Sequence, residues 1–375
     1  MPSRNLLLPI AGVVAALIIG GFFYAGLDEG NSLGTVLRRL EHGQIVGTVA
    51  WSPDQKTLAT GNFGDNRIWL WDVAEGKNLW QVHKPGVRNS RRLEFDLPSR
   101  SVLTSSTTAT QEQNRDSAVA LLGLEDGRLL RSLDDTPPER NSNAAIDFAF
   151  SPNRSRLAVI LGGEGGRVDL FDTTSWARVG QIGPVVNRYG RAAGLNKIVL
   201  DPGRDIAVIG LIDGDVQVWS PSTNRLRAKF SGFAVAVTAM VLNPATGAVV
   251  MGGDSMTVRS FEKGPDAPVR ADDPATLVRA YDPVSGILLM TYAGPGGTVS
   301  ALAVSPNGRY VAAAKQTGIV AVWDAWSGKL IAYQDFGTTS VDGIAFSPDG
   351  TRLAYGVGTH VEIVALDPKR FEPTK

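Results

Sequence analysis

The sequence predicts an all-β protein, a seven-bladed β-propeller preceded by one N-terminal transmembrane helix. Three observations carry this prediction. A hairpin pattern, made of an apolar run, a turn containing proline and a second apolar run, recurs seven times along the chain. Short third and fourth strands follow most of these hairpins. A long apolar segment without charge precedes all of them.

The hairpin pattern is clearest in residues 344–356, which read IAFSPDGTRLAYG. Proline presets φ for such a turn, and glycine supplies the position that needs a positive φ. The same position in the seven hairpins is occupied by Pro53, Pro98, Pro152, Pro202, Pro244, Pro306 and Pro348. These prolines are 42 to 62 residues apart. A period in the forties is typical of a propeller that has one four-stranded sheet per blade.

A third strand that ends in an aromatic residue, often followed by aspartate, comes after most hairpins. The examples are Arg67–Asp72, Arg167–Asp172, Val216–Ser220, Ile319–Asp324 and, less regularly, Val361–Asp367. At these residues the sequence resembles the WD40 repeat family, over about residues 34–370. Trp71-Asp72 and Trp323-Asp324 match the Trp-Asp signature of that family, while Phe171-Asp172 and Trp219-Ser220 are near forms of it.

The resemblance implies a set of buried polar residues that stabilise each blade. We assign structural roles in this set to His42, Thr60, Asp65, Trp71, Asp213, Trp219 and Trp323. His42 and Asp65 also admit an interpretation as a catalytic pair. The structural interpretation is favoured because buried polar groups need partners, which such a set supplies.

Two blades are irregular in sequence. The second has a long polar connection, Ser105–Ser117, between its second and third strands. The fifth offers two candidate third strands, Thr257–Phe261 and Thr276–Tyr281, separated by a segment rich in proline and charge. An insertion in blade five accounts for this pattern, although an eighth blade remains the alternative.

The last blade has no fourth strand of its own, because only residues 371–375 follow its third strand and the short segment after it. Gly34–Leu40 aligns with the fourth strands of the other blades. We therefore expect this N-terminal strand to complete the last blade, which removes the open edges that the sheet would otherwise present.

The N-terminal segment Leu6–Gly26 contains 21 residues and no charge. As a helix it is roughly 31 Å long, enough to cross the hydrocarbon core of a membrane. A cleaved signal peptide is the alternative, but its apolar region is usually shorter. Arg4 precedes the segment, and Asp28 and Glu29 follow it, which places the N-terminus in the cytoplasm. The expected order is a cytoplasmic N-terminus (1–5), the anchor (6–26), a linker (27–33), the propeller (34–370) and a tail (371–375). The propeller is then extracytoplasmic, and periplasmic in a bacterium.

Composition and motifs exclude several function classes. The chain has 37 basic and 37 acidic residues, so we expect no nucleic-acid partner. It has no cysteine, and its three histidines are in no zinc-binding pattern. No motif of a catalytic nucleophile or phosphate-binding loop stands out. The sequence therefore predicts no catalytic residues, no metal and no cofactor.

The residues that favour partner binding lie in two long, basic connections between blades. The connection His83–Arg92 contributes Arg88, Arg91 and Arg92, and the connection Gly183–Lys197 contributes Arg188, Tyr189 and Arg191. Both belong to the same face of the ring, and arginine and tyrosine are enriched at interfaces. The alternative is that both are ordinary solvated loops.

These observations predict a non-catalytic protein–protein interaction platform in a membrane or envelope complex. The alternative is an extracytoplasmic hydrolase or ligand sensor that uses the central channel, which convergent carboxylates or a metal there would favour. A third interpretation is an accessory subunit whose helix Leu6–Gly26 packs on other helices through its small residues.

Overall fold

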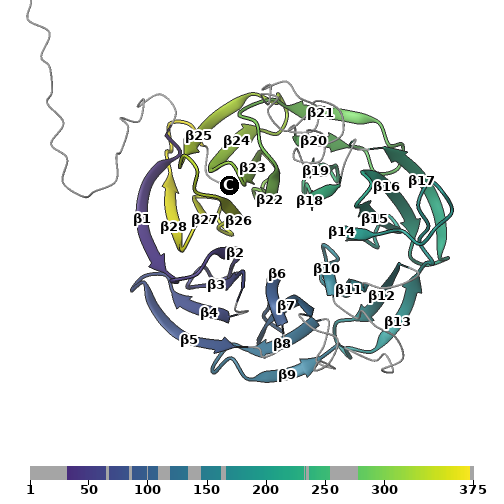
Figure 1. Cartoon of the computed structure of the whole chain (residues 1–375), viewed down its shortest axis with the longest axis horizontal. Helices are drawn as coiled ribbons and strands as arrows, with labels where there is room; N and C mark the ends of the chain where they lie inside the picture. Colours follow the sequence, from purple (N-terminus) through teal and green to yellow (C-terminus); the bar gives the residue numbers. More distant parts are fainter. Residues whose placement is uncertain are drawn as a thin grey trace, which may run out of the picture.

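A computed structural model of the chain describes residues 32–64, 67–83, 87–98, 100–108, 119–133, 145–161, 166–231, 233, 236–253 and 278–371. In it, seven antiparallel four-stranded sheets surround a central axis (Figure 1). The predicted all-β, seven-bladed propeller is therefore confirmed. The predicted transmembrane segment Leu6–Gly26 lies outside the described residues. None of the described residues forms a helix long and apolar enough to span a membrane.

Within each blade the strands follow one another outward from the axis (Figure 1). We call these four strands a, b, c and d. Blade 1 contains β2 (Val46–Trp51), β3 (Thr57–Asn62), β4 (Arg67–Asp72) and β5 (Lys77–His83). Blade 2 contains β6 (Val87–Asp96), β7 (Ser101–Thr108), β8 (Val119–Gly123) and β9 (Leu129–Ser132). Blade 3 contains β10 (Ala145–Phe150), β11 (Arg156–Leu161), β12 (Arg167–Asp172) and β13 (Arg178–Ile182).

The remaining blades repeat this arrangement. Blade 4 contains β14 (Leu195–Asp201), β15 (Ile206–Leu211), β16 (Asp215–Ser220) and β17 (Arg225–Ser231). Blade 5 contains β18 (Val237–Leu242), β19 (Val249–Gly253), β20 (Val278–Tyr281) and β21 (Leu288–Tyr292). Blade 6 contains β22 (Val299–Val304), β23 (Tyr310–Lys315), β24 (Ile319–Asp324) and β25 (Leu330–Asp335). Blade 7 contains β26 (Val341–Phe346), β27 (Arg352–Val357), β28 (His360–Leu366) and, from the other end of the described chain, β1 (Gly34–Glu41).

The ring is closed by β1, as the alignment of Gly34–Leu40 predicts. β1 pairs antiparallel with β28 and supplies the outer strand of blade 7 (Figure 1). Arg39 lies opposite Glu362 in this pairing, and its Nε donates to Glu362 Oε1 at 2.9 Å. Burial opposes ionisation of Glu362, but His360, whose Nε2 lies 3.7 Å from Oε1, and the charge of Arg39 outweigh it and lower the pKa of this carboxyl. An ion pair and the pairing of β1 with β28 thus join the first and last strands of the propeller.

The a–b hairpins of blades 1, 3, 6 and 7 share a serine-centred turn, which explains the recurring Ser-Pro-Asp and Ser-Pro-Asn sequences. In blade 7 the Ser347 hydroxyl donates to Asp349 Oδ1 at 2.6 Å and accepts from the Arg352 backbone N–H at 2.9 Å. Gly350 follows with φ of 70°, a conformation that favours glycine. Equivalent serine bonds occur at Ser52, Ser151 and Ser305. These local bonds satisfy the turn backbone and fix the hairpin register.

The aspartate after the aromatic residue of strand c has a similar local role. Asp324 Oδ1 accepts from the backbone N–H groups of Trp326 and Ser327, at 3.1 and 2.8 Å, in the c–d turn. Burial opposes ionisation here, and these bonds outweigh it and lower the pKa of Asp324. The same aspartate-to-backbone bond recurs in three other blades, at Asp72, Asp172 and Asp282. The Trp-Asp pairs therefore mark the end of strand c and the start of its turn.

The hydrophobic core lies between blades rather than in one centre. The described residues form seven apolar clusters, and each joins two neighbouring sheets. The cluster between blades 7 and 1, for example, packs Leu40, Val361 and Ile363 against Val46, Trp51, Trp69 and Trp71. Each blade therefore buries both of its faces against its two neighbours.

The second of the two candidate third strands in blade 5 is the one the structure uses. β20 (Val278–Tyr281) pairs with β19 and with β21. The other candidate, Thr257–Phe261, lies outside the described residues. In the described part of the chain the number of blades is seven, so the alternative of an eighth blade finds no support there.

Candidate functional site

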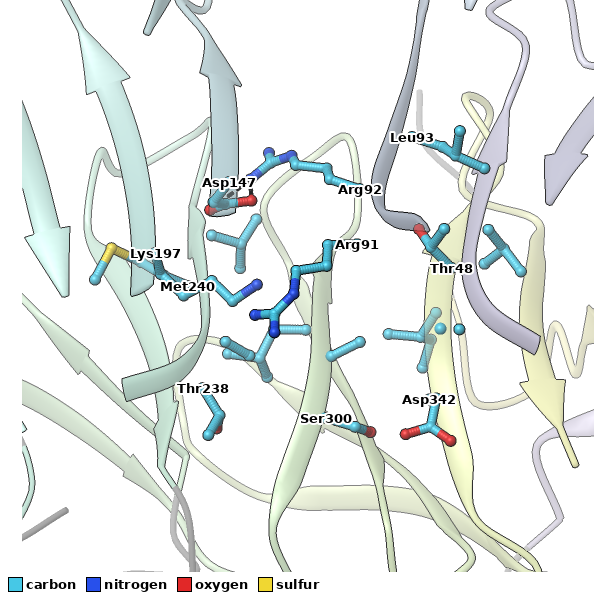
Figure 2. Close-up of a pocket in the computed structure, with 18 of the residues that line it drawn as sticks. Thr48, Arg91, Arg92, Leu93, Asp147, Lys197, Thr238, Met240, Ser300 and Asp342 are labelled. Carbon is cyan, nitrogen blue, oxygen red and sulfur yellow. Dashed lines mark hydrogen bonds and ion pairs between the residues drawn. The ribbon is translucent and has the colours of Figure 1, made fainter. Parts of the chain in front are cut away.

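The central channel is lined by strands from all seven blades. It contains a cavity of about 190 Å³ (Figure 2). Every a strand contributes: β2, β6, β10, β14, β18, β22 and β26. The lining side chains that carry charge are Arg91, Arg92, Glu94, Asp147, Lys197 and Asp342. The cavity therefore gathers residues that are up to about 300 positions apart in the sequence.

A bulge near the start of each a strand determines which side chains enter this cavity. In five a strands the pairing with strand b skips one residue, in β6 it skips Arg88 and Arg91 separately, and in β26 it skips two residues that face one. The skipped residues at equivalent positions are Gly47, Arg91, Ile146, Asn196, Thr238, Ser300 and the pair Asp342-Gly343. A bulge bends the strand and redirects its extra side chain. The bulges thus form a ring of equivalent positions.

In blades 4 to 6 the bulge side chain fastens one blade to the next. Asn196 Nδ2 donates to the Val237 carbonyl at 2.6 Å, and Thr238 Oγ1 donates to the Val299 carbonyl at 2.7 Å. Ser300 Oγ donates to the Val341 carbonyl at 2.5 Å. Each acceptor is the first residue of the next a strand. Thr238 and Ser300 line this side of the cavity, and their hydroxyl donors are consequently already used.

The opposite side of the channel is charged, and Arg92 contacts both of the acidic side chains there. Its guanidinium bonds Glu94 Oε1 at 2.7 and 2.9 Å and lies 3.4 Å from Asp147. Asp147 is 1% exposed and also accepts from the backbone N–H of Ile198 at 3.1 Å. Burial alone would lower the pKa of Arg92, but the charges of Asp147 and Glu94 outweigh it and raise that pKa. The ion pair between Arg92 and Asp147 thereby joins blades 2 and 3, and the hydrogen bond from Ile198 to Asp147 joins blade 4 to them.

Asp342 lies in a different part of the cavity from Arg92 and Asp147 (Figure 2). Its Oδ2 accepts from the Ser340 hydroxyl at 2.6 Å, and burial raises its pKa. Glu94 and Asp147 both engage Arg92. Among the described residues no group of three or more histidine, cysteine, aspartate or glutamate side chains is arranged to hold a metal ion. The cavity therefore offers charged and polar side chains to an ion or polar group.

The prediction that Arg88, Arg91 and Arg92 belong to a loop between blades is wrong. These residues lie within β6, which begins at Val87 and pairs with β7. Only the backbone of Arg88 is described. Arg91 and Arg92 instead line the channel. The physical reason is that β7 extends to Thr108 and pairs with β6 as far as Val87, so the chain continues as a strand that has Arg88 and Arg91 at its two bulges.

The second predicted connection is a loop, and it is held firmly to blade 4. The Asn187 side chain accepts from the backbone N–H groups of Tyr189 and Arg191, at 3.0 and 3.1 Å. Arg188 Nη2 bonds Asp215 Oδ1 at 2.8 Å, so its charge is engaged inside the blade. Tyr189, by contrast, is 76% exposed, and Arg191 is exposed as well. The loop therefore presents Tyr189 and Arg191 to solvent on a constrained backbone.

The predicted structural residues have different partners in different blades. Trp71 Nε1 donates to Thr60 Oγ1 at 2.8 Å, and the His42 ring contacts those of Trp69 and Trp71, with centroids 4.3 and 5.2 Å apart. Asp65 lies outside the described residues. The other assigned tryptophans bond other acceptors: Trp219 bonds Gln217 Oε1 at 3.1 Å and Trp323 bonds the Ala293 carbonyl at 2.7 Å. Asp213 lies beside Arg188, 4.0 Å from its Nε.

Sequence reasoning missed two features of the surface. The c–d turns of blades 5 and 6 and the start of β21 expose several apolar side chains: Val284, Ile287, Leu288, Leu289 and Trp326. The Trp326 turn packs on β21, because Gly328 lies against Met290 and Thr291. The available signal was a tryptophan two residues after the end of strand c, where blades 1 and 4 have Ala74 and Ser222. A second cavity of about 520 Å³ lies among the a–b turns of blades 3 to 5, where Arg204 bonds Asp201 and the Gly247 carbonyl.

Comparison with known proteins agrees with this architecture. The family model described as "WD domain, G-beta repeat" matches residues 34–72 and 286–324. Two curated relatives, eukaryotic translation initiation factor 3 subunit I from two strains of Aspergillus fumigatus, are each 35% identical to the chain over 77 residues. That similarity covers 20% of this chain and 22% of each relative, so the chain matches about a fifth of their length. The two matched repeats and the ring of seven four-stranded blades together show that the chain belongs to the WD40-repeat β-propeller family.

Proposed function

We propose that the propeller is a non-catalytic platform for protein–protein interaction, anchored in a membrane by Leu6–Gly26 and facing the extracytoplasmic side. WD40 propellers typically mediate protein interactions, and the relatives above are, by name, a subunit of a larger factor. The observation that carries the proposal is the loop 183–194. It holds Tyr189, 76% exposed, and the exposed Arg191 on a backbone fixed by Asn187 and Arg188.

This loop has the properties of a binding anchor. Tyrosine and arginine supply most of the binding energy in many interfaces, because they combine contact area with directed hydrogen bonds. A constrained loop also loses little conformational entropy when a partner binds. The proposed partner is a protein with acidic or polar groups on its contact surface, in a membrane or envelope complex.

The combined change of Tyr189→Ala and Arg191→Glu is expected to weaken partner binding at least tenfold, as the loss of an interface anchor does. The protein is isolated from membranes in mild detergent, and proteins that co-purify in stoichiometric amounts are quantified. The matched control changes Leu226→Ala and Arg225→Glu on β17, the exposed outer strand of the same blade. Equal recovery of every partner with both double variants would contradict the proposed surface.

The membrane anchor has its own test. The full-length protein is expected to stay in the membrane pellet after alkaline extraction, and a variant that lacks residues 1–31 is expected to be released. The propeller should be degraded by protease added to the extracytoplasmic side of intact cells or spheroplasts after mild heating. Release of the full-length protein by alkali, or protection of the propeller until the membrane is dissolved, would rule out the proposed anchoring and orientation.

A further inference from the structure

We propose that the mouth of the central channel is a binding site for a small oxyanion, formed by Arg91 and Lys197. This site is separate from the exposed loop of Tyr189 and does not depend on the platform function. The ligand class is a phosphate-sized or short dicarboxylate anion. The proposal rests on the positions of the two cations, on the absence of local partners for them, and on the size of the cavity.

Arg91 and Lys197 point into the same space from different blades. Arg91 is the bulged residue of β6, and Lys197 follows the bulge of β14. Both line the cavity, and Figure 2 shows their charged ends directed toward one another. Like charges repel, so a side chain with access to solvent would turn away unless something negative balances the pair. The convergence is therefore what an anion-binding site requires.

Neither cation is neutralised within the described part of the chain, where no hydrogen bond or ion pair is formed by either side chain. The acidic residues of the cavity are engaged elsewhere. Glu94 and Asp147 bind Arg92, and Asp342 accepts the Ser340 hydroxyl. Burial lowers the pKa of Lys197; the charge of Asp147 opposes that effect, and those of Arg92 and Arg91 add to it. A bound anion would relieve this repulsion.

The blade-to-blade bonds explain why the site is on this side of the channel. The bulge residues Asn196, Thr238 and Ser300 donate hydrogen bonds to backbone carbonyls of the next blade. The equivalent position of β6 is occupied by Arg91, whose longer side chain extends into the cavity. The cavity of about 190 Å³ is smaller than the roughly 300–1,000 Å³ of sites for drug-sized ligands. It therefore fits an anion of a few heavy atoms.

The test uses the full-length protein in mild detergent with inorganic phosphate and succinate as probes. Binding is measured by isothermal titration calorimetry at constant ionic strength, with chloride as the reference anion. Phosphate, succinate or both should bind in a ratio of one per chain, and the preferred probe distinguishes a phosphate ligand from a carboxylate ligand. Arg91→Gln and Lys197→Met should each weaken binding by roughly tenfold or more, as loss of a charge-assisted hydrogen bond does.

Arg225→Gln is the matched control, because it removes one positive charge from the exposed strand β17. It should bind the probes as the unchanged protein does. Thermal melting identifies any variant that has lost its fold. Arg91→Gln changes an exposed side chain, so this variant can still test the site if Lys197→Met unfolds. Binding of neither probe above the chloride reference, or equal binding by the channel variants and the control, would overturn the proposal.

Discussion

Leu40→Ala is expected to lower the free energy of unfolding by about 2–5 kcal/mol, the range for truncating a buried leucine. Leu40 belongs to β1, is 1% exposed and packs in the cluster between blades 7 and 1. The effect is large because β1 supplies the outer strand of blade 7 and so pairs the N-terminal strand of the propeller with its C-terminal strand. Urea denaturation followed by tryptophan fluorescence measures it.

Leu37→Ala is the matched control, since it makes the same chemical change on the same strand. Leu37 is 45% exposed and is the residue skipped in the pairing of β1 with β28. Its substitution should change stability by no more than about 0.5 kcal/mol, as surface changes usually do. Equal destabilisation by both substitutions would show that closure does not depend on the inward face of β1.

Lys315→Met is expected to stabilise the propeller at neutral pH and to flatten its stability between pH 8 and 10.5. Lys315 lies at the end of β23, is 2% exposed and donates to the Pro295 carbonyl. Burial lowers its pKa from 10.5 to about 8. At about 1.4 kcal/mol per pKa unit, the charged form costs the folded state about 3 kcal/mol.

The sign of the pH dependence follows from proton binding. Between pH 8 and 10.5 the folded protein holds fewer protons on Lys315 than the unfolded chain does, so this residue makes stability rise with pH. Below pH 8 the contribution is constant and unfavourable. Loss of the bond to Pro295 offsets part of the gain in the Met variant, which leaves an expected increase of about 1–3 kcal/mol at pH 7.

The measurement is urea denaturation of both proteins at several pH values from 7 to 10.5. The difference in stability between them should shrink as the pH rises, because the unchanged protein recovers what burial of the charge had cost. Lys329→Met, which removes an exposed lysine from the same blade, is the control. A stability difference that is independent of pH would mean that Lys315 is not charged and buried as the structure indicates.

Local signals predict most of the fold from the sequence. Residues 67–72, 167–172 and 319–324 are predicted third strands and are strands with the same bounds in the structure. Turn prolines, alternating apolar residues and the aspartate after strand c each determine the local backbone through residues only a few positions away in the sequence. The closing strand Gly34–Leu40 was also predictable, because a blade without an outer strand leaves an edge that needs a partner.

The candidate site was much less accessible to sequence analysis. Basic residues after Pro85-Gly86 resemble a loop, and nothing in residues 87–92 shows that β7 is long enough to pair with them. The bulge that directs Arg91 into the channel arises where neighbouring a strands crowd around the axis. Lys197 meets it only because blades 2 and 4 share that axis. Such convergence depends on the closed ring, which no short stretch of sequence encodes.

The most direct test of the interaction platform is photocrosslinking in intact cells from position 189. A photoreactive amino acid replaces Tyr189 in the full-length protein, and a second version carries it at Leu226, which is 47% exposed on the outer strand of the same blade. We expect a discrete crosslinked protein from position 189, absent from position 226 and reduced by Arg191→Glu. No adduct from position 189, or the same adducts from both positions, would contradict the claim that this face binds a partner.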